Sequence, residues 1–397
     1  MGNDRDSEVG AEGRKLRVVF VGHIARVSGG EVALSRLVPA LMEHIELSVV
    51  LGEDGPIVER LRQFGVPVEV LPLAPRLRDI RKDSVRASGF DLRALAALPA
   101  YILRLRGRIR ELDADIVHTN TLKAALYGGA AARLAGVPAV WHIRDRIADD
   151  YLPHGAVRLV RLAARILPSA VIANSQSTLD ALPNLKRSRV LYNPIVVPDS
   201  VDQPADRPAV AGTELVIGIV GRLAPWKGQH VFLESFAEAF GGTAVRGRII
   251  GSALFGEDDY AQALRDQAQR LAIAEQVEFR GFREDVWAEL AELDVLVHCS
   301  ITPEPFGQVV LEAMAGRVPV VAARAGGPAE LITDGVDGLL TAPGDVGELA
   351  AALRGLAGDP KLRSALARAG KERSLEFTPE RTAAQLLGVY RRIARRR

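Results

Sequence analysis

Two apolar segments that end in glycine most constrain the fold of this chain. Leu16–Gly22 and Leu215–Gly221 are short and rich in β-branched residues, and each is followed by a turn and a helical pattern. A strand, a turn and a helix form the opening unit of a doubly wound α/β domain. Strands and helices alternate after both segments, and 397 residues exceed what one ordinary core holds. We therefore expect two Rossmann-like, doubly wound domains.

The boundary between the two domains is expected where the alternation stops. The segment after Asn193-Pro194 contains three prolines and three aspartates, which makes it the best linker in the chain. The polar N-terminal residues predict a disordered tail. The expected organisation is a tail at 1–14, a first domain at 15–197, a linker at 198–213, a second domain at 214–375, and a C-terminal helix at 376–397 that packs back on the first domain.

Composition excludes several kinds of protein. The net charge is +2, so nothing supports general nucleic-acid binding. Cys299 is the one cysteine, which rules out an intramolecular disulfide and a cysteine zinc cluster and fits residence in the cytoplasm. No apolar segment is long enough to span a bilayer. Two basic stretches, 102–110 and 390–397, are interpreted as solvated helix surfaces, with peripheral membrane contact as the less favoured alternative.

One segment of the second domain is suited to hold a phosphate. Pro305 disfavours helical backbone at Glu304, so a helix is expected to start just beyond Glu304. The backbone N–H groups from Phe306 to Val309 would point out of the helix N-terminus, where anions bind. Glu304 in the loop and Glu312 in the helix body would flank this phosphate seat. A ligand that carries both hydroxyl groups and phosphates, such as a nucleotide sugar, has matching chemistry.

A pair of cations follows the first strand of the same domain. Arg222 offers a planar fork of donors and Lys227 a compact charge, and both suit a diphosphate. Each cluster also has a plainer interpretation, the cations as a solvated surface turn and the glutamates as partners of the helix dipole. Because the carboxyl ends of parallel strands meet at one edge of a sheet, we expect both clusters to face one ligand.

Three motifs of the second domain together resemble one enzyme family. They are Gly221-Arg-Leu-x-x-x-Lys227-Gly228, Glu304-Pro-Phe-Gly-Gln-Val-Val-Leu-Glu312 and Gly326-Gly-Pro-Ala-Glu330. From about Leu16 to its C-terminal helix, the chain is similar to the retaining glycosyltransferases of family 4. The resemblance implies the GT-B fold, in which two Rossmann-like domains face a central cleft. It also implies that the first domain binds the acceptor and the second a nucleotide sugar.

The resemblance assigns roles in binding the donor. Glu304 would hold hydroxyls of the donor sugar, and Glu312 would hold the ribose diol. Arg222 and Lys227 would bind the diphosphate. The remaining donor-side residues are Phe306, Gly307, Gln308 and Val309, whose backbone would touch sugar or phosphate, and Gly281, Phe282 and Arg283, which would surround the nucleobase.

The first domain carries fewer recognisable positions. Gly29 and Gly30 are similar to a glycine loop beneath the diphosphate and beside the acceptor. His142, which ends a predicted strand, is similar to a histidine close to the transferred sugar, although a histidine there is also commonly a satisfied structural residue. The residues expected on the acceptor side are His118, Arg144 and Asp145.

The expected reaction transfers a sugar from a nucleoside diphosphate sugar to an acceptor hydroxyl, with retention at the anomeric carbon. The resemblance favours UDP over GDP, and a same-face reaction in which the leaving phosphate takes the acceptor proton. Protein cations would replace a metal, so no metal and no cofactor beyond the donor is expected. Two alternatives stay open: an epimerase or hydrolase of nucleotide sugars, and a non-catalytic nucleotide-sugar-binding protein. The expected catalytic residues are His142, Arg222, Lys227 and Glu304.

Overall fold

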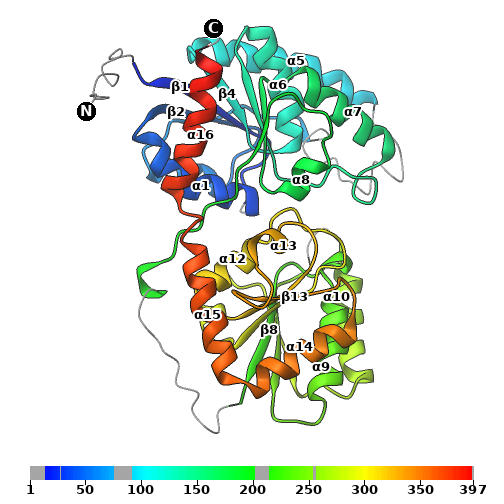
Figure 1. The fold of residues 1–397 in the computed structure, drawn as a ribbon. Coiled ribbons are helices and arrows are strands. Elements are labelled where there is room, and N and C mark those ends of the chain that lie inside the picture. The colour runs from blue at the N-terminus through cyan, green and yellow to red at the C-terminus, as the bar shows by residue number, and fades with distance from the viewer. Residues whose placement is uncertain (1–13, 27, 76–91, 202–213, 254–255, 396–397) are drawn as a thin grey trace, which may run out of the picture. The chain divides into compact units, whose positions relative to one another are not determined.

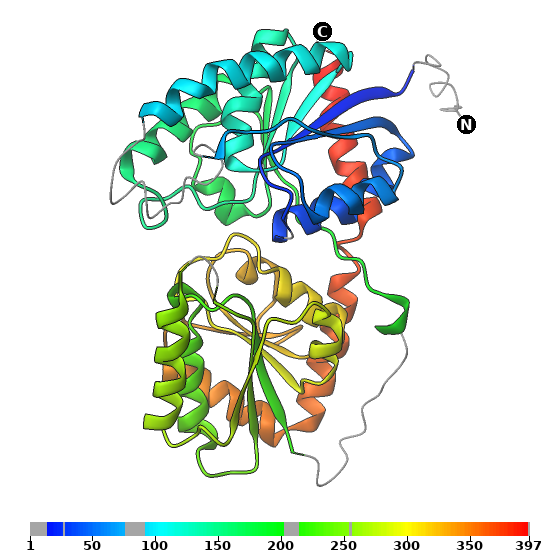
Figure 2. The same ribbon diagram turned by 180° about the vertical axis from the view of Figure 1, so that it is seen from behind.

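The structure is a computed structural model that describes residues 14–26, 28–75, 92–201, 214–253 and 256–395. Within them the chain forms two sheets, each with helices on both faces (Figure 1 and Figure 2). This confirms the expectation of two Rossmann-like domains. Almost all of the expected tail and most of the expected linker lie outside the described residues.

The first sheet has seven strands in the order β3-β2-β1-β4-β5-β6-β7. β1 lies between β2 and β4 and is parallel to both. Its last five residues are all buried, because helices cover both faces of the sheet, and for that reason it is a continuous apolar run in the sequence. The strands are β1 (Leu16–Gly22), β2 (Ile45–Leu51), β3 (Val68–Val70), β4 (Ile116–Thr119), β5 (Ala139–Ile143), β6 (Ala170–Ala173) and β7 (Ser188–Val190).

The helices between these strands follow the usual crossover pattern of a parallel sheet. α5 packs against α6, and α1 packs against α2. The helices are α1 (Gly29–Met42), α2 (Pro56–Gln63), α5 (Leu92–Glu111), α6 (Leu122–Ala135), α7 (His154–Ile166) and α8 (Gln176–Asp180).

The second sheet has six strands in the order β10-β9-β8-β11-β12-β13, and all neighbouring pairs are parallel. Alternate residues of one strand enter different cores: Val295 and Val297 join a cluster on one face, and Leu296 joins a cluster on the other. The strands are β8 (Val216–Val220), β9 (Arg246–Ile250), β10 (Val277–Gly281), β11 (Val295–His298), β12 (Val320–Ala323) and β13 (Leu339–Thr341).

Helices cover both faces of the second sheet as well. α9 packs against α14, and α12 packs against α15. The helices are α9 (Gln229–Phe240), α10 (Asp258–Arg270), α11 (Val286–Ala291), α12 (Gln308–Ala315), α13 (Pro328–Leu331), α14 (Val346–Gly358), α15 (Pro360–Ser374) and α16 (Pro379–Ala394), with short 3-10 turns η1 (Asp199–Val201) and η2 (Pro225–Lys227).

The chain divides into two compact units. The first consists of residues 1–142, 158–171 and 386–397, and the second of residues 143–157 and 172–385. The last turns of α16 therefore belong with the first sheet. The linker position expected from the sequence stays a prediction. None of the described helices is both long enough and apolar enough to cross a bilayer.

Candidate functional site

The order of the strands in the second sheet reverses between β8 and β11. β8 and β11 are neighbours and run parallel to each other. From β8 the chain continues to β9 on one side of this pair, and from β11 it continues to β12 on the other side. Loops that follow the strands at such a switch point are the usual place for a ligand in an open α/β sheet. The two loops here are residues 221–228 and 299–307, which carry the cation pair and the Glu304 motif.

The two loops are locked together by backbone contacts. The Ile301 N–H donates to the Trp226 carbonyl at 2.9 Å. Gly228 has φ +76°, and a Cβ there would lie 2.0 Å from the Cys299 carbonyl oxygen, so only glycine allows this approach. Burial raises the pKa of the Cys299 thiol to about 12, and the protonated thiol donates to the Gly228 carbonyl at 3.0 Å. The lone cysteine is thus part of the frame of the site.

Arg222 and Lys227 both lie close to the ring of Trp226. The Arg222 guanidinium carbon is 5.9 Å from the centre of the Trp226 ring, and Lys227 Nζ is 4.6 Å from it. Gln229 Nε2 holds the loop by donating to the Arg222 carbonyl at 2.9 Å. Each cation also has a carboxylate partner, since Arg222 Nη1 lies 3.2 Å from Glu257 Oε2 and Lys227 Nζ lies 2.6 Å from Glu304 Oε2.

The Glu304 carboxylate is the centre of a buried polar cluster. Lys227 Nζ donates to Oε2 at 2.6 Å, His298 Nε2 lies 2.7 Å from the same oxygen, and Ser300 Oγ donates to it at 3.0 Å. Within the part of the chain that the structure describes, every side-chain contact to the Glu304 carboxylate is therefore made to Oε2. Oε1 remains as the oxygen that can accept a hydrogen bond from a ligand.

The cluster keeps Glu304 ionised. Burial by itself would raise the pKa of this carboxyl, but the charge of Lys227 and the contact with His298 outweigh burial and hold the pKa well below its ordinary value. A carboxylate with so low a pKa is a weak base and a weak nucleophile. It is suited to accept hydrogen bonds from hydroxyl groups.

Helix α12 begins directly after this cluster. Gly307, with φ +85°, is its N-cap residue, and Gln308 is its first residue. The helix starts later than Phe306, because the left-handed backbone of Gly307 delays it, and Phe306 itself is buried in the core of the second unit. The N–H groups of Gln308 and Val309 belong to the first turn and have no acceptor within the helix. Of the residues between Phe306 and Val309 that the sequence placed at the helix N-terminus, Gln308 and Val309 lie in the first turn of α12, and their binding of an anion stays a prediction.

The Gly326-Gly327 pair clamps the Glu304 loop from the side. The Gly327 N–H donates to the Glu304 carbonyl at 2.8 Å. A Cβ on Gly326 would lie 2.2 Å from that carbonyl oxygen, and a Cβ on Gly327 would lie 2.4 Å from Phe306. Both glycines are therefore required by close backbone approach, which gives this motif a structural role.

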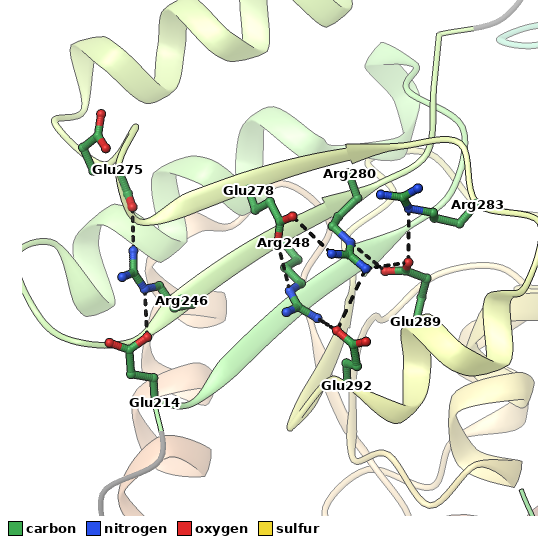
Figure 3. A network of polar contacts seen from close by, with 9 residues as sticks. All are labelled: Glu214, Arg246, Arg248, Glu275, Glu278, Arg280, Arg283, Glu289 and Glu292. Carbon is green, nitrogen blue, oxygen red and sulfur yellow. Dashed lines mark hydrogen bonds and ion pairs between the residues drawn. The ribbon is translucent and has the colours of Figure 1, made fainter.

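The other residues that the sequence predicts on the donor side lie on neighbouring elements. Glu312 is buried in the body of α12. Gly281, with φ +71°, ends β10, and the next residue, Phe282, is 70% exposed. Arg283 Nε lies 3.2 Å from Glu289 Oε1, at the end of an ion-pair network that runs over β9, β10 and α11 (Figure 3). The exposed ring of Phe282 is therefore the surface that this loop offers to a flat ligand.

Two of the expected acceptor-side residues contact other side chains of the second compact unit. Arg144 donates to the Asn193 side chain, and Asp145 Oδ1 accepts a hydrogen bond from the Tyr151 hydroxyl at 3.3 Å. Gly29 and Gly30 are the first two residues of α1, so they belong to a helix N-terminus.

The two candidate histidines of the first unit lie in contact. His118 Nε2 in β4 is 3.2 Å from His142 Nδ1 in β5. His118 is completely buried and His142 is 2% exposed. The side chain of His118 therefore has no solvent-exposed surface.

Three residues of these clusters were not identified from the sequence. His298 and Ser300 both contact Glu304, and Tyr390 of α16 contacts His118. His298 and Ser300 could have been found from their position, since they flank the end of the strand that leads into the Glu304 loop. Tyr390 gives no such signal, because it is 272 residues from its partner.

No metal site is visible in the part of the chain that the structure describes. No group of three or more His, Cys, Asp or Glu side chains there is arranged to hold an ion. Asp113 and Asp115 form an Asp-x-Asp sequence, but they lie before β4 and bind arginines. Asp113 pairs with Arg17, and Asp115 pairs with Arg14 at 2.8 Å.

Family models match both halves of the chain. The model described as Glycosyltransferase Family 4 matches residues 27–197, and the model described as Glycosyl transferases group 1 matches residues 202–373. A D-inositol 3-phosphate glycosyltransferase of Actinosynnema mirum is 30% identical over 325 residues, which are 75% of this chain and 76% of that protein. A 2-deoxystreptamine glucosyltransferase of Streptomyces kanamyceticus is 28% identical, covering 91% of this chain and 98% of its own.

A solved structure is similar over almost the whole chain. The crystal structure of Anabaena HepE in complex with UDP-glucose has a TM-score of 0.78 and 30% sequence identity. The match covers 94% of this chain and 100% of HepE.

We predict that Gly228→Ala is much more damaging than Gly242→Ala. Gly228 has φ +76° and Gly242 has φ +78°, but a Cβ at Gly242 meets nothing within 4 Å, whereas at Gly228 it meets the Cys299 carbonyl. Gly242→Ala should lower the free energy of unfolding by about 1–2 kcal/mol from backbone strain, and Gly228→Ala by about 2–5 kcal/mol because overpacking is added. Urea unfolding of both variants measures the difference, and equal losses would contradict the close approach.

We also predict a pH-dependent gap in stability between the natural protein and Glu304→Gln. The depressed pKa of Glu304 stabilises the fold above the carboxyl's unfolded pKa of about 4.5, and this stabilisation declines as the pH falls below that value. The variant lacks this contribution and leaves Lys227 without its partner. Its free energy of unfolding should therefore be lower at neutral pH, and the gap should narrow below about pH 4.5. A gap that stays constant across this range would show that Glu304 is not held ionised.

Proposed function

The chain belongs to the family 4 glycosyltransferases of the GT-B fold, and from this premise we propose that it transfers a hexosyl group from a UDP-sugar to an acceptor hydroxyl with retention at the anomeric carbon. The observation that carries the proposal is the Lys227–Glu304 cluster at the switch point of the second sheet. It sets a cation and an accepting carboxylate oxygen beside the N-terminus of α12, which matches a sugar joined to a phosphate.

The diphosphate is the part of the donor whose charge grows as the bond to the sugar breaks. Arg222 and Lys227 are positioned beside Trp226, and the first N–H groups of α12 follow the same cluster. These fixed positive groups stabilise the leaving diphosphate without rearrangement during the reaction. Ion pairs with Glu257 and Glu304 hold the two cations in position.

Glu304 orients the donor sugar in this proposal. Oε1 accepts from sugar hydroxyls while Lys227, His298 and Ser300 hold Oε2. The depressed pKa of Glu304 argues against its attack on the anomeric carbon. Retention then follows from a same-face reaction in which the leaving phosphate takes the proton of the acceptor. Glu312 binds the ribose, and the exposed ring of Phe282 stacks on the base.

The choice of UDP is supported by the similarity to HepE, whose crystal structure holds UDP-glucose. The names of two relatives suggest which acceptors to test first. They give D-inositol 3-phosphate and 2-deoxystreptamine as acceptors, and both are cyclic polyols with several hydroxyl groups. We propose small cyclic polyols as the first acceptors to test.

We predict that the protein releases UDP from UDP-glucose only when an acceptor is present, and that the product keeps the α configuration. Glu304→Ala should lower kcat by about 100-fold or more, because it removes a hydrogen bond that orients the reacting sugar. Glu238→Gln is a matched control, since its ion pair with Arg354 lies on α9 and α14 away from the site. UDP release and proton NMR of the product measure both points.

The other outcomes of that assay identify the alternatives. Donor consumption without acceptor would indicate a hydrolase or an epimerase. Donor binding with no UDP release, whatever the acceptor, would indicate a non-catalytic binding protein. A β-linked product, or near-normal turnover in Glu304→Ala, would contradict the proposed mechanism.

We predict that sugar transfer continues in the presence of a strong chelator. Lys227, Arg222 and the helix N-terminus supply the positive charge that a divalent ion supplies in metal-dependent transferases. Turnover with and without EDTA should agree within about twofold. A complete loss that added Mg²⁺ or Mn²⁺ restores would contradict metal independence.

A further inference from the structure

Three side chains of the first unit form a buried hydrogen-bonded chain. The hydroxyl of Tyr390, on α16, lies 2.8 Å from Nδ1 of His118 on β4, and His118 Nε2 lies 3.2 Å from Nδ1 of His142 on β5. Tyr390 and His118 are fully buried and His142 is 2% exposed. The ring of Phe20 stacks on His118 at 4.2 Å between centroids, which holds the imidazole in this orientation. The order of contacts from hydroxyl to imidazole to imidazole is therefore fixed by packing.

The proton of the Tyr390 hydroxyl decides which group donates in each of these hydrogen bonds. Burial raises the pKa of Tyr390 well above its ordinary value, so the hydroxyl keeps its proton. Among the described residues, His118 Nδ1 is the only acceptor within hydrogen-bond distance of this hydroxyl. A buried O–H group without an acceptor is strongly unfavourable. The hydroxyl therefore donates, and His118 Nδ1 accepts.

The proton positions on both histidines follow in turn. A neutral imidazole carries one proton, so His118 with a bare Nδ1 has its proton on Nε2. That N–H group donates to His142 Nδ1, which must also be bare. The proton of neutral His142 is then on Nε2, the ring nitrogen opposite to the contact with His118.

We propose that Tyr390 and His118 are positioning residues that hold His142 in the tautomer with its proton on Nε2. The role of His142 in this inference rests on the proposed function. In this tautomer Nε2 of His142 is a hydrogen-bond donor and no longer an acceptor. It cannot accept the proton of the acceptor hydroxyl, which leaves that step to the departing phosphate.

The tautomer can be measured directly in the full chain. Histidine labelled with nitrogen-15 gives long-range proton–nitrogen correlations that separate a protonated ring nitrogen from a bare one. The chain has seven histidines, and the signals of His142 are those lost in His142→Asn. At neutral pH we expect Nε2 of His142 to be protonated and Nδ1 to be bare. A protonated Nδ1 and a bare Nε2 on His142 would overturn the proposal, and this result needs no substitution at Tyr390 or His118.

A matched pair of tyrosine variants tests the origin of the tautomer. Tyr390→Phe removes only the hydroxyl, and His142 should then show a mixture of tautomers and kcat should fall about tenfold. Tyr101→Phe is the control, since it removes another buried hydroxyl of the first unit, one that donates to the Leu71 carbonyl at 3.3 Å. It should leave the nitrogen signals of His142 and kcat unchanged.

The nitrogen signals separate this inference from the proposed function. If the protein transfers no sugar, the signals still report whether Tyr390 sets the tautomer of His142. If Tyr390→Phe leaves these signals unaltered, the positioning role is wrong whatever the activity. A fall in melting temperature alone, equal in Tyr390→Phe and Tyr101→Phe, would assign Tyr390 a purely structural role.

Discussion

The buried ion pair between Lys227 and Glu304 is the contact on which the candidate site depends. It joins the loop after β8 to the loop after β11, and its atoms are 2.6 Å apart with both side chains at most 15% exposed. Such a pair adds little net stability compared with apolar residues, but removal of one partner leaves a buried charge and costs about 3–5 kcal/mol. The pair therefore fixes the geometry of the two loops. It also gives the two oxygens of Glu304 different roles, because Lys227 contacts Oε2, whereas Oε1 can accept a hydrogen bond from a ligand.

Close backbone approach supplies the frame around this ion pair. A Cβ would meet backbone oxygen at 2.0 Å on Gly228, at 1.9 Å on Gly251 and at 2.2 Å on Gly326. Glycine is thus needed at these positions, of which Gly228 and Gly326 belong to the sequence motifs, because the backbones that follow neighbouring strands approach closely there. The motifs therefore combine two kinds of residue. The glycines allow the loops after neighbouring strands to approach, and the charged residues between them are the candidates for ligand binding.

Much of this arrangement could be predicted from the sequence because it is local or follows from parallel-sheet topology. Strands such as β8 are continuous apolar runs, and the loops that follow parallel strands share one edge, so the proximity of the loops that carry Lys227 and Glu304 was expected. The ion pair between the two side chains was not. The start of α12 at Gln308 was not, because the left-handed backbone of Gly307 delays the helix. Partners such as Tyr390 for His118 were also missed, since a contact between residues so far apart in sequence leaves no local pattern.

In the proposed function, Glu304 binds the sugar of the donor, and Arg222 and Lys227 bind its diphosphate. Calorimetric titration of UDP and of UDP-glucose into the natural protein and into Glu304→Gln tests this claim most directly. The account predicts that the natural protein binds UDP-glucose more tightly than UDP. In Glu304→Gln this advantage should disappear while the affinity for UDP is kept or increased, because a negative charge near the phosphates is removed. An equal loss of affinity for both ligands, or an undiminished preference for UDP-glucose, would contradict the account.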